Sequence, residues 1–232
     1  MNEIKLSQRL KMIADHVSQN ARLADIGSDH AYLPAYLVQS GQIDFAVAGE
    51  VVEGPFQIAK QHVIELGLHN KIDVRLANGL AVIQEKDQID TIVIAGMGGI
   101  LISEILAAGL DKLSSVKRLI LQPNNHEDTL RSWLVEQCLV IKEEQILLEA
   151  GKFYEIIIAE ATDGSVSKTQ DLSVTELMFG PKLSAEKSPV FRKKWQKELK
   201  TLEKILIRLP EEQAEKRAEV LAQKAMIEEV LL

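Results

Sequence analysis

The feature that most constrains this 232-residue chain is the alternation of short apolar runs with helix-like segments over its first 160 residues. Five of these runs have the length of a strand, and most end in Gly, Asn or Pro. They are RLADIG (22–27), FAVAGEV (45–51), KIDVRLAN (71–78), DTIVIAG (90–96) and RLILQP (118–123). Such alternation predicts an α/β fold with right-handed crossovers and a parallel sheet that helices cover on both faces.

The pattern changes after the fifth run. Two longer strand-like runs, LVIKEEQILLEA (139–150) and KFYEIIIAEA (152–161), have only Gly151 clearly between them, so they predict an antiparallel hairpin. Parallel strands followed by a terminal hairpin are typical of class I (Rossmann-like) methyltransferases that use S-adenosylmethionine. Dehydrogenase domains that bind NAD usually continue with another crossover helix.

The last third of the chain predicts a separate helical unit. A polar stretch at 162–171 resembles a linker, so we expect a methyltransferase domain at 1–161 and a linker with a helical coiled coil at 162–232. In the first helix, apolar residues recur at intervals of 4, 3, 4 and 3 and would form a coiled-coil seam: Trp195, Leu199, Leu202, Leu206 and Leu209. Pro210 suits the first turn of a second helix, whose small-residue face would be Ala218, Leu221 and Ala225.

Charge is distributed unevenly along the chain. The net charge is −7, yet residues 182–208 hold nine Lys or Arg against three acids. Such a stretch predicts either a solvated helix surface or a face that binds nucleic-acid phosphates. The candidate phosphate contacts are Lys193, Lys197 and Lys200.

Several classes of protein are disfavoured by composition. A single cysteine, Cys138, excludes an intramolecular disulfide and a multi-cysteine zinc site, and the histidines lack metal-like spacing, so no metal is expected. No apolar run is long enough to span a bilayer, and the charged N-terminus has no export signal, so we expect a cytoplasmic protein. The oligomeric state is left open, with a monomer compatible with the sequence.

The end of the first run, ADIGSDHAYLP (24–34), is the first candidate for a cofactor site. In a doubly wound sheet this turn meets a nucleotide-like ligand, and Gly27 allows a tight approach. Asp29 stands where a dinucleotide-binding motif has its second glycine. A carboxylate there would repel a pyrophosphate but accept the cationic S-adenosylmethionine, although Asp25 and Asp29 could also simply cap the turn.

The other run ends offer further candidates, each with a plainer alternative. Glu50 can accept both hydroxyls of a ribose or be an exposed strand-end acid, and Asn78 with Gly79 can meet an adenine edge or form a plain turn. The glycine-rich IAGMGG (94–99) leaves backbone open to a flat ligand or serves packing alone. Pro123, Asn124 and Asn125 could offer amide groups to a base, or one asparagine could cap the following helix.

Taken together, these motifs resemble the bacterial tRNA (adenine-N1)-methyltransferases of the TrmK family, which modify adenine 22. The resemblance covers essentially the whole chain and lies in LSQRL, ADIGSDHAYLP, GEVVEGP, ANGL, IAGMGG, LQPNN and GKFYEI. It implies a class I methyltransferase domain, S-adenosylmethionine as methyl donor and tRNA as substrate. Carried over by position, the cofactor-binding residues would be Arg9, Asp25, Gly27, Asp29, Glu50, Val51, Asn78, Gly79, Ala95 and Gly96, with Met97 and Gly98 facing the target base.

The chemistry of the reaction fits this resemblance. Adenine N1 has an in-plane lone pair and needs no covalent nucleophile, so catalysis would come mostly from positioning. The methylated ring is positively charged, and Asp29 is the candidate carboxylate to stabilise it. Two alternatives stay open: an oxidoreductase that binds NAD on the same type of sheet, and a non-catalytic RNA-binding adaptor.

Overall fold

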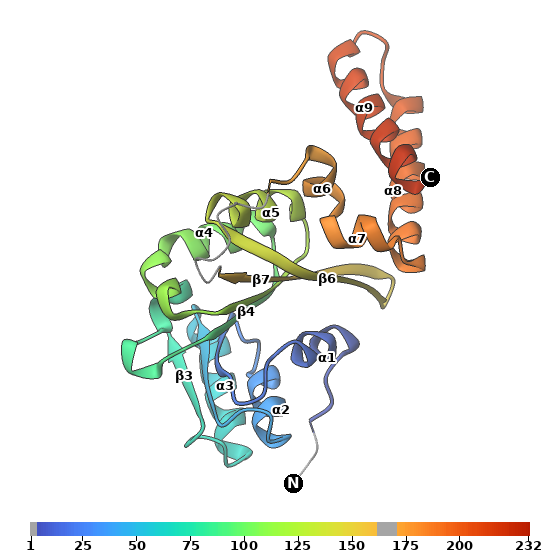
Figure 1. Ribbon diagram of the computed structural model, residues 1–232. Coiled ribbons are helices and arrows are strands. Elements are labelled where there is room, and N and C mark those ends of the chain that lie inside the picture. Colours follow the sequence, from blue (N-terminus) through green and yellow to red (C-terminus); the bar gives the residue numbers. More distant parts are fainter. Residues whose placement is uncertain (1–3, 162–170) are drawn as a thin grey trace.

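The computed structural model (Figure 1) describes residues 4–161 and 171–232. It contains a seven-stranded sheet in the order β3-β2-β1-β4-β5-β7-β6. The first five strands are parallel, β7 runs antiparallel to β5, and β6 runs antiparallel to β7. Their bounds are β1 (Arg22–Ile26), β2 (Phe45–Glu50), β3 (Ile72–Leu76), β4 (Thr91–Met97), β5 (Arg118–Pro123), β6 (Leu139–Glu149) and β7 (Lys152–Ala161). The predicted parallel sheet and terminal hairpin are therefore confirmed.

Two apolar clusters lie on opposite faces of this sheet. Because successive strand residues point to opposite faces, Leu23 belongs to one cluster and Ala24 to the other. The first cluster packs beneath α1 (Gln8–Asp15), α2 (Tyr32–Gln39) and α3 (Glu53–Glu65). The second packs beneath the 3₁₀ turn η1 (Gly79–Val82), α4 (Gly99–Ala108) and α5 (Glu127–Glu136). This arrangement is the doubly wound sheet expected from the alternation of runs.

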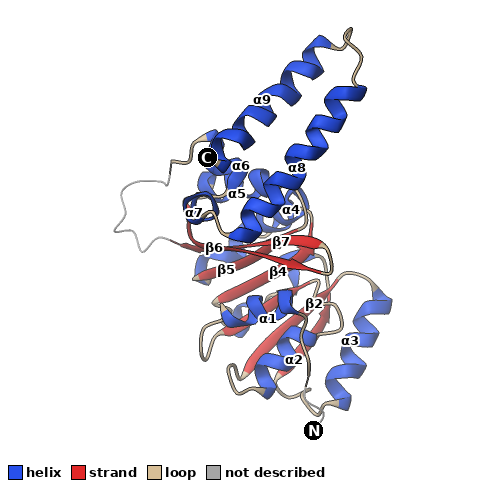
Figure 2. Ribbon diagram, turned by 90° about the vertical axis from the view of Figure 1, so that its right-hand side faces the viewer, coloured by secondary structure: helices blue, strands red, loops and turns tan. Residues whose placement is uncertain are grey.

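The C-terminal helices form a hairpin that projects beyond the sheet (Figures 1 and 2). Two short helices, α6 (Val174–Phe179) and α7 (Pro181–Glu186), lead to α8 (Pro189–Arg208) and α9 (Ala214–Leu231). Trp195 and Leu202 of α8 are buried against the interior of the hairpin, and the ring of Phe179 lies 4.5 Å from that of Trp195. The predicted helical hairpin is thus present. Residues 162–170 of the predicted linker lie outside the described residues.

Two details of the predicted hairpin are wrong. Pro210 lies in the turn before α9, which begins only at Ala214. The residue before a proline avoids helical geometry, so Leu209 is extended (φ −78°, ψ 121°) and α8 ends there. Ala218, Leu221 and Ala225 are exposed. The buried face of α9 instead carries the larger Val220, Ile227 and Val230, whose burial against α8 removes more apolar surface from water.

A buried cluster of charges joins the helical hairpin to the sheet. Arg131 of α5 is fully buried and donates to Glu144 on β6 (2.7 Å) and to Glu155 on β7 (2.5 Å). Lys194 of α8 donates to the other oxygen of Glu155 (2.7 Å) and to Glu127 (2.9 Å). Burial alone would raise the pKa of Glu155, but Lys194 and Arg131 hold that pKa below its ordinary value. Ion pairs therefore connect α8 of the helical hairpin to α5 and β7.

Candidate active site

A cavity of about 350 Å³ opens where β1 and β4 end. Here the chain leaves β1 for α2 on one face and leaves β4 for α4 on the other, which is the crevice where doubly wound sheets bind ligands. Eight predicted site residues line it: Arg9, Asp25, Gly27, Asp29, Ala95, Gly96, Met97 and Asn124. Residues from four separate segments of the chain thus meet as the sequence motifs suggested.

The turn after β1 has an unusual backbone that shapes the cavity. Gly27 has φ +70°, and Asp29, His30 and Ala31 follow in the left-handed region, where residues with a Cβ are strained. Contacts from two other elements help to hold this turn: the backbone N–H of Asp29 donates to Glu50 Oε1 (2.8 Å), and His62 Nδ1 lies 2.6 Å from the carbonyl oxygen of His30. A Cβ at Gly27 would lie 2.3 Å from Met97 Cε, so a side chain there would require Met97 to move.

The floor of the cavity is acidic. Asp25 is buried and accepts a hydrogen bond from Ser28 Oγ (2.6 Å). Burial raises the pKa of Asp25 to about 7, and the charge of Glu50 acts in the same direction. The side chain of Asp29, by contrast, is 85% exposed at the rim, where its Oδ1 lies 3.4 Å from His30 Nε2. The site therefore combines one carboxyl group that titrates near neutral pH with one that is largely solvated.

Glu50 and Val51 lie outside the lining of this cavity. Glu50 ends β2, is only 7% exposed and uses one carboxylate oxygen to hold Asp29, while burial raises its pKa. Val51 follows it and is 63% exposed. Both are placed beside the β1 turn, as a ribose site would require, although only the backbone hydrogen bond to Asp29 connects Glu50 to the cavity directly.

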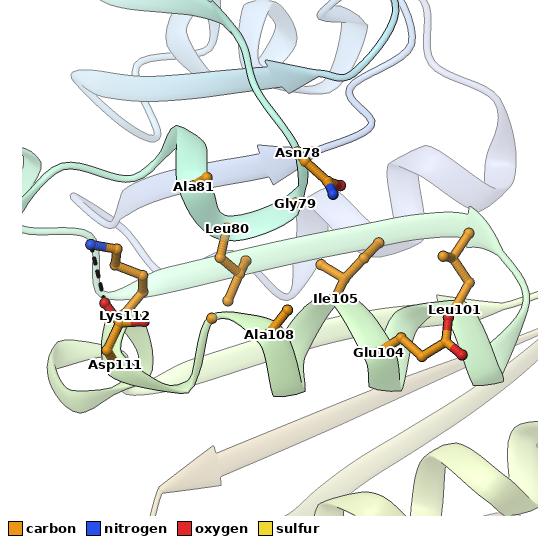
Figure 3. Close-up of a pocket in the computed structure, with 11 residues that line it drawn as sticks. Asn78, Gly79, Leu80, Ala81, Leu101, Glu104, Ile105, Ala108, Asp111 and Lys112 are labelled. Carbon is orange, nitrogen blue, oxygen red and sulfur yellow. Dashed lines mark ion pairs between the residues drawn. The ribbon is translucent and has the colours of Figure 1, made fainter.

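Asn78 and Gly79 line a second cavity, of about 410 Å³, between η1 and α4. Figure 3 shows Leu80 of η1 and Ile105 of α4 directed toward each other, with Asn78 at one end. The ion pair of Lys112 with Asp111 (3.2 Å) lies at the other end. The predicted adenine-contacting turn is therefore located at a hollow with an apolar middle and polar ends.

The loops after β4 and β5 are bound to each other. Asn124 donates from Nδ2 to the carbonyl oxygen of Gly96 (2.7 Å) and from its backbone to that of Met97 (2.7 Å). The N–H of Gly99 donates to the carbonyl oxygen of Asn125 (2.8 Å), and a Cβ at Gly99 would lie 2.1 Å from the His126 carbonyl oxygen. For Gly99, this contact favours the alternative that the glycine serves close packing.

The alternative that an asparagine caps the helix after β5 is wrong. The N-cap of α5 is His126, in the left-handed region (φ 52°), and no side chain makes a capping hydrogen bond there. Asn124 is instead directed to Gly96, and a Cβ at Gly98 would meet Asn125 Oδ1 at 2.8 Å. Pro123 is buried at the end of β5, so it positions this loop from below.

Sequence reasoning missed four residues of the site. Leu10, Ser28 and Tyr154 line the cavity, and Gln122 is hydrogen-bonded to Arg9, which lines it. Arg9 Nη1 donates to Gln122 Oε1 (2.7 Å), and its guanidinium carbon lies 5.4 Å from the centroid of the Tyr154 ring. All four lie inside motifs already singled out, so their position in LSQRL, ADIGSDH, GKFYEI and LQPNN was the available signal.

The candidate lysines lie on α8, away from the cavity lining. Lys193, Lys197 and Lys200 are exposed, and Lys197 Nζ lies 5.6 Å from the centroid of the Phe153 ring. Phe153 precedes Tyr154, so β7 connects the basic helix to the cavity. The neighbouring cations have structural partners: Lys194 belongs to the buried charge cluster, and Arg192 Nη1 donates to the carbonyl oxygen of Leu231 (2.7 Å).

Neither a metal cluster nor a membrane helix is found at 4–161 or 171–232. No group of three or more His, Cys, Asp or Glu in these ranges is arranged to hold a metal ion. None of the helices there combines the length and the apolar character needed to cross a bilayer.

Comparison with known proteins gives a consistent result. Residues 23–230 match the family described as tRNA (adenine(22)-N(1))-methyltransferase, TrmK. The tRNA (adenine(22)-N(1))-methyltransferase of Bacillus subtilis is 47% identical over 205 residues, covering 88% of this chain and 86% of that protein.

Two solved structures add the ligands of relatives. A putative tRNA (m1A22) methyltransferase of Streptococcus pneumoniae, in complex with S-adenosyl-L-methionine, is 53% identical with a TM-score of 0.90, covering 98% of this chain and 100% of that one. TrmK of M. capricolum, in complex with S-adenosyl-homocysteine, is 30% identical with a TM-score of 0.86, covering 97% of each chain.

Proposed function

This chain belongs to the TrmK family of tRNA (adenine(22)-N(1))-methyltransferases, and on that premise we propose that the cavity between α1, β1 and β4 is its methyl-transfer site. The protein is an S-adenosylmethionine-dependent enzyme that methylates N1 of adenine 22 in tRNA. Membership of this family removes the support for an NAD-linked oxidoreductase and for a non-catalytic adaptor.

The residues of the cavity fit this cofactor. S-Adenosylmethionine, when bound, supplies a methyl group on a cationic sulfur and also carries an ammonium and a carboxylate. The buried Asp25 and the neighbouring Glu50 offer negative charge on one side, and the Arg9 guanidinium offers positive charge on the other. Gly27 and Gly96, both with positive φ, keep the backbone open between them. This charge arrangement, opposite to what a pyrophosphate requires, is the observation that carries the assignment of the cavity.

The remaining predicted cofactor residues extend the site from the cavity. We assign Glu50 and Val51 to the ribose, and Asn78 with Gly79 to the adenine of the cofactor. Supporting this, Glu50 is tied to the β1 turn through Asp29, and Asn78 begins the hollow between η1 and α4.

The target adenine would enter at the rim formed by Asp29, Met97, Gly98, Asn124 and Asn125. Pro123 is buried and would act by holding the two asparagines in place. Asp29 and Asn124 both line the cavity, from opposite loops, and both are exposed to an incoming base. We propose that Asp29 offsets the positive charge of the methylated ring, a role in which positioning and electrostatics replace a nucleophile. Because N1 lies on the Watson–Crick edge, the base must leave its pairing before it reacts.

Residues 162–232 serve tRNA binding in this proposal, while residues 1–161 hold the cofactor. Lys193, Lys197 and Lys200 face solvent on a helix whose local charge is positive, in a chain that is acidic overall. Contacts to phosphates would add affinity and orient the RNA without reading its bases. A tRNA substrate also makes the cytoplasm the compartment we propose.

One experiment tests the function directly. The pure protein is incubated with unmodified tRNA and methyl-labelled S-adenosylmethionine, and the modified nucleotide is mapped. We expect 1-methyladenine at position 22. Label at another nucleotide would move the target site, and calorimetric binding of NAD without binding of S-adenosylmethionine would reject the assignment of the cavity.

A further inference from the structure

Gln122 occupies an unusual place between the two halves of the active site. It is fully buried at the end of β5, yet its carboxamide makes three hydrogen bonds. Its Oε1 accepts from Arg9 Nη1 (2.7 Å), while its Nε2 donates to the Pro123 carbonyl oxygen (2.8 Å) and to Asn124 Oδ1 (3.0 Å). Arg9 and Asn124 both line the cavity. One buried side chain therefore contacts a residue assigned to the cofactor and a residue at the entry of the target base.

The donors and acceptors allow only one orientation of these amides. A guanidinium can only donate, so Arg9 must face the oxygen of Gln122 rather than its nitrogen. The Gln122 nitrogen then faces Asn124 and requires the oxygen of Asn124 there. The Nδ2 of Asn124 is consequently left to the Gly96 carbonyl oxygen, which it contacts at 2.7 Å. Arg9 thus sets the orientation of an asparagine side chain with which it has no direct hydrogen bond.

The fixed orientation has a consequence for the substrate. Oδ1 of Asn124 accepts one hydrogen bond from Gln122 and retains a second acceptor position, because a carboxamide oxygen has two lone pairs. An adenine carries an amino donor beside N1, whereas a guanine carries a carbonyl oxygen at that place. An acceptor held at the entry of the cavity favours adenine and places N1 by its neighbouring amino group.

We propose that Gln122 is a positioning residue that fixes the Asn124 carboxamide for the amino group of the target adenine, and at the same time holds Arg9 for the cofactor. This inference rests on the proposed function of the site. Gln122 does not line the cavity and touches neither reactant; it acts through the two residues that do.

Two substitutions separate the two arms of Gln122. Gln122→Glu keeps an acceptor for Arg9 but removes the donor to Asn124 and to the Pro123 carbonyl oxygen, whereas Gln122→Met has a similar volume and removes all three hydrogen bonds. For Gln122→Glu we expect the Kd for S-adenosylmethionine to stay within about twofold and the single-turnover methyl-transfer rate to fall about tenfold or more, since small displacements of a reactant are costly. For Gln122→Met we expect the Kd to rise about tenfold as well, because the charged Arg9 guanidinium loses the carboxamide oxygen to which it donates.

A double-mutant cycle with Asn124→Ala tests whether Gln122 acts through Asn124. Asn124 is exposed, and the backbone hydrogen bonds of Asn124 to Met97 and of Gly99 to Asn125 do not need its side chain, so its truncation should leave the fold intact. We expect Gln122→Glu to cost little further rate in the Asn124→Ala background, as coupled residues are not additive. The inference would be overturned if the fold-loss in rate of the double variant equalled the product of the two single losses. A Gln122→Glu enzyme as fast as the wild type would overturn it too. If Gln122→Glu fails to fold, Gln122→Met completes the cycle at saturating S-adenosylmethionine, where its weaker cofactor binding does not limit the rate.

The cycle also distinguishes this inference from the function on which it rests. Methyl transfer by the wild-type enzyme to adenine 22 is measured first, and its absence would reject the proposed function. If the wild type methylates adenine 22 but the effects of the two substitutions on the rate are independent, only the role of Gln122 is rejected.

Discussion

Asp25 and Asp29 lie four residues apart in one turn, but their surroundings give them different chemistry. Asp25 is buried beneath Ser28 and titrates near neutral pH, while the Asp29 side chain is 85% exposed. Charge on a buried group acts in a low dielectric and is felt strongly by a bound ligand, whereas water screens an exposed one. We therefore expect Asp25 to control cofactor affinity and Asp29 to act only once the RNA covers it.

Cofactor affinity should depend on pH through Asp25. Its pKa is raised to about 7, so below that value it is mostly neutral and cannot attract the cationic cofactor. Binding of S-adenosylmethionine should strengthen about tenfold between pH 5.5 and 7, and calorimetry in two buffers of different ionisation enthalpy should detect proton release. Asp25→Asn should flatten this profile. An equally steep profile in that variant would assign the titration to another group.

The same shift has a defined sign for stability. The folded state binds more protons than the unfolded state between the ordinary aspartate pKa and pH 7, so the contribution of Asp25 to stability decreases as pH rises through that window. Comparison of urea unfolding of the wild type and Asp25→Asn at pH 5 and pH 7.5 should show a relative gain for the variant at the higher pH.

Asp29 can be tested separately from cofactor binding. Asp29→Asn keeps the size of the side chain and removes its charge, so we expect the single-turnover rate to fall more than tRNA affinity does. Equal losses in rate and in binding would make Asp29 a residue that positions the cofactor or the turn.

Glu50 gives a further prediction at the residue scale. Glu50→Ala removes both the proposed ribose acceptor and the oxygen that holds the Asp29 N–H, so S-adenosylmethionine binding should weaken by about 1.5–3 kcal/mol. Glu50→Gln retains an acceptor for Asp29 and is the matched control, with a smaller expected loss. Calorimetry checks both, and unchanged affinity in Glu50→Ala would remove Glu50 from the site.

At the scale of elements, the five parallel strands and the terminal hairpin were predictable because apolar runs and glycine ends mark them locally. The face of α9 was not, since the choice of Val220 over Leu221 depends on the shape of α8 rather than on the helix itself. The site divides in the same way. Gly27 and Asp29 follow from one motif, whereas the contact of Arg9 with Gln122 joins residues 113 positions apart and leaves no local pattern.

The charge cluster makes a prediction about how elements are joined. Arg131→Met leaves Glu144 and Glu155 buried with fewer partners, so the free energy of unfolding should fall by about 3–5 kcal/mol. Lys193→Met, one residue from Lys194 but exposed, is the control and should change stability by less than about 0.5 kcal/mol. Urea unfolding measures both. A loss in Arg131→Met no larger than in the control would show that the cluster adds nothing.

At the scale of the whole molecule, an acidic protein must attract an acidic substrate, and the distribution of charge decides whether it can. Residues 182–208 carry a local surplus of cations, and Arg192 and Lys194 among them are already bound within the protein. The exposed lysines of α8 are thus among the cations of this surplus that remain available to RNA.

Replacement of Lys193, Lys197 and Lys200 by Ala together should weaken tRNA binding and reduce the slope of log affinity against log salt by about 2. Cofactor affinity should not change, because these lysines lie outside the cavity lining. A triple variant at Lys60, Lys86 and Lys117, also exposed and with the same charge loss, is the matched control. Equal weakening in both variants would mean that net charge, rather than this helix, is responsible.

The buried charge cluster also fixes the distance between the lysines of α8 and the cavity. Because Arg131, Glu155 and Lys194 fasten α8 to the sheet, the lysines cannot approach the cavity or retreat from it independently. If these lysines bind phosphates as proposed, an RNA must have a defined distance between the phosphates bound by α8 and the adenine that enters the cavity. Selection of the substrate would then follow the folded outline of tRNA, and a short unfolded RNA with the same nucleotides around its adenine would fail to satisfy both ends at once.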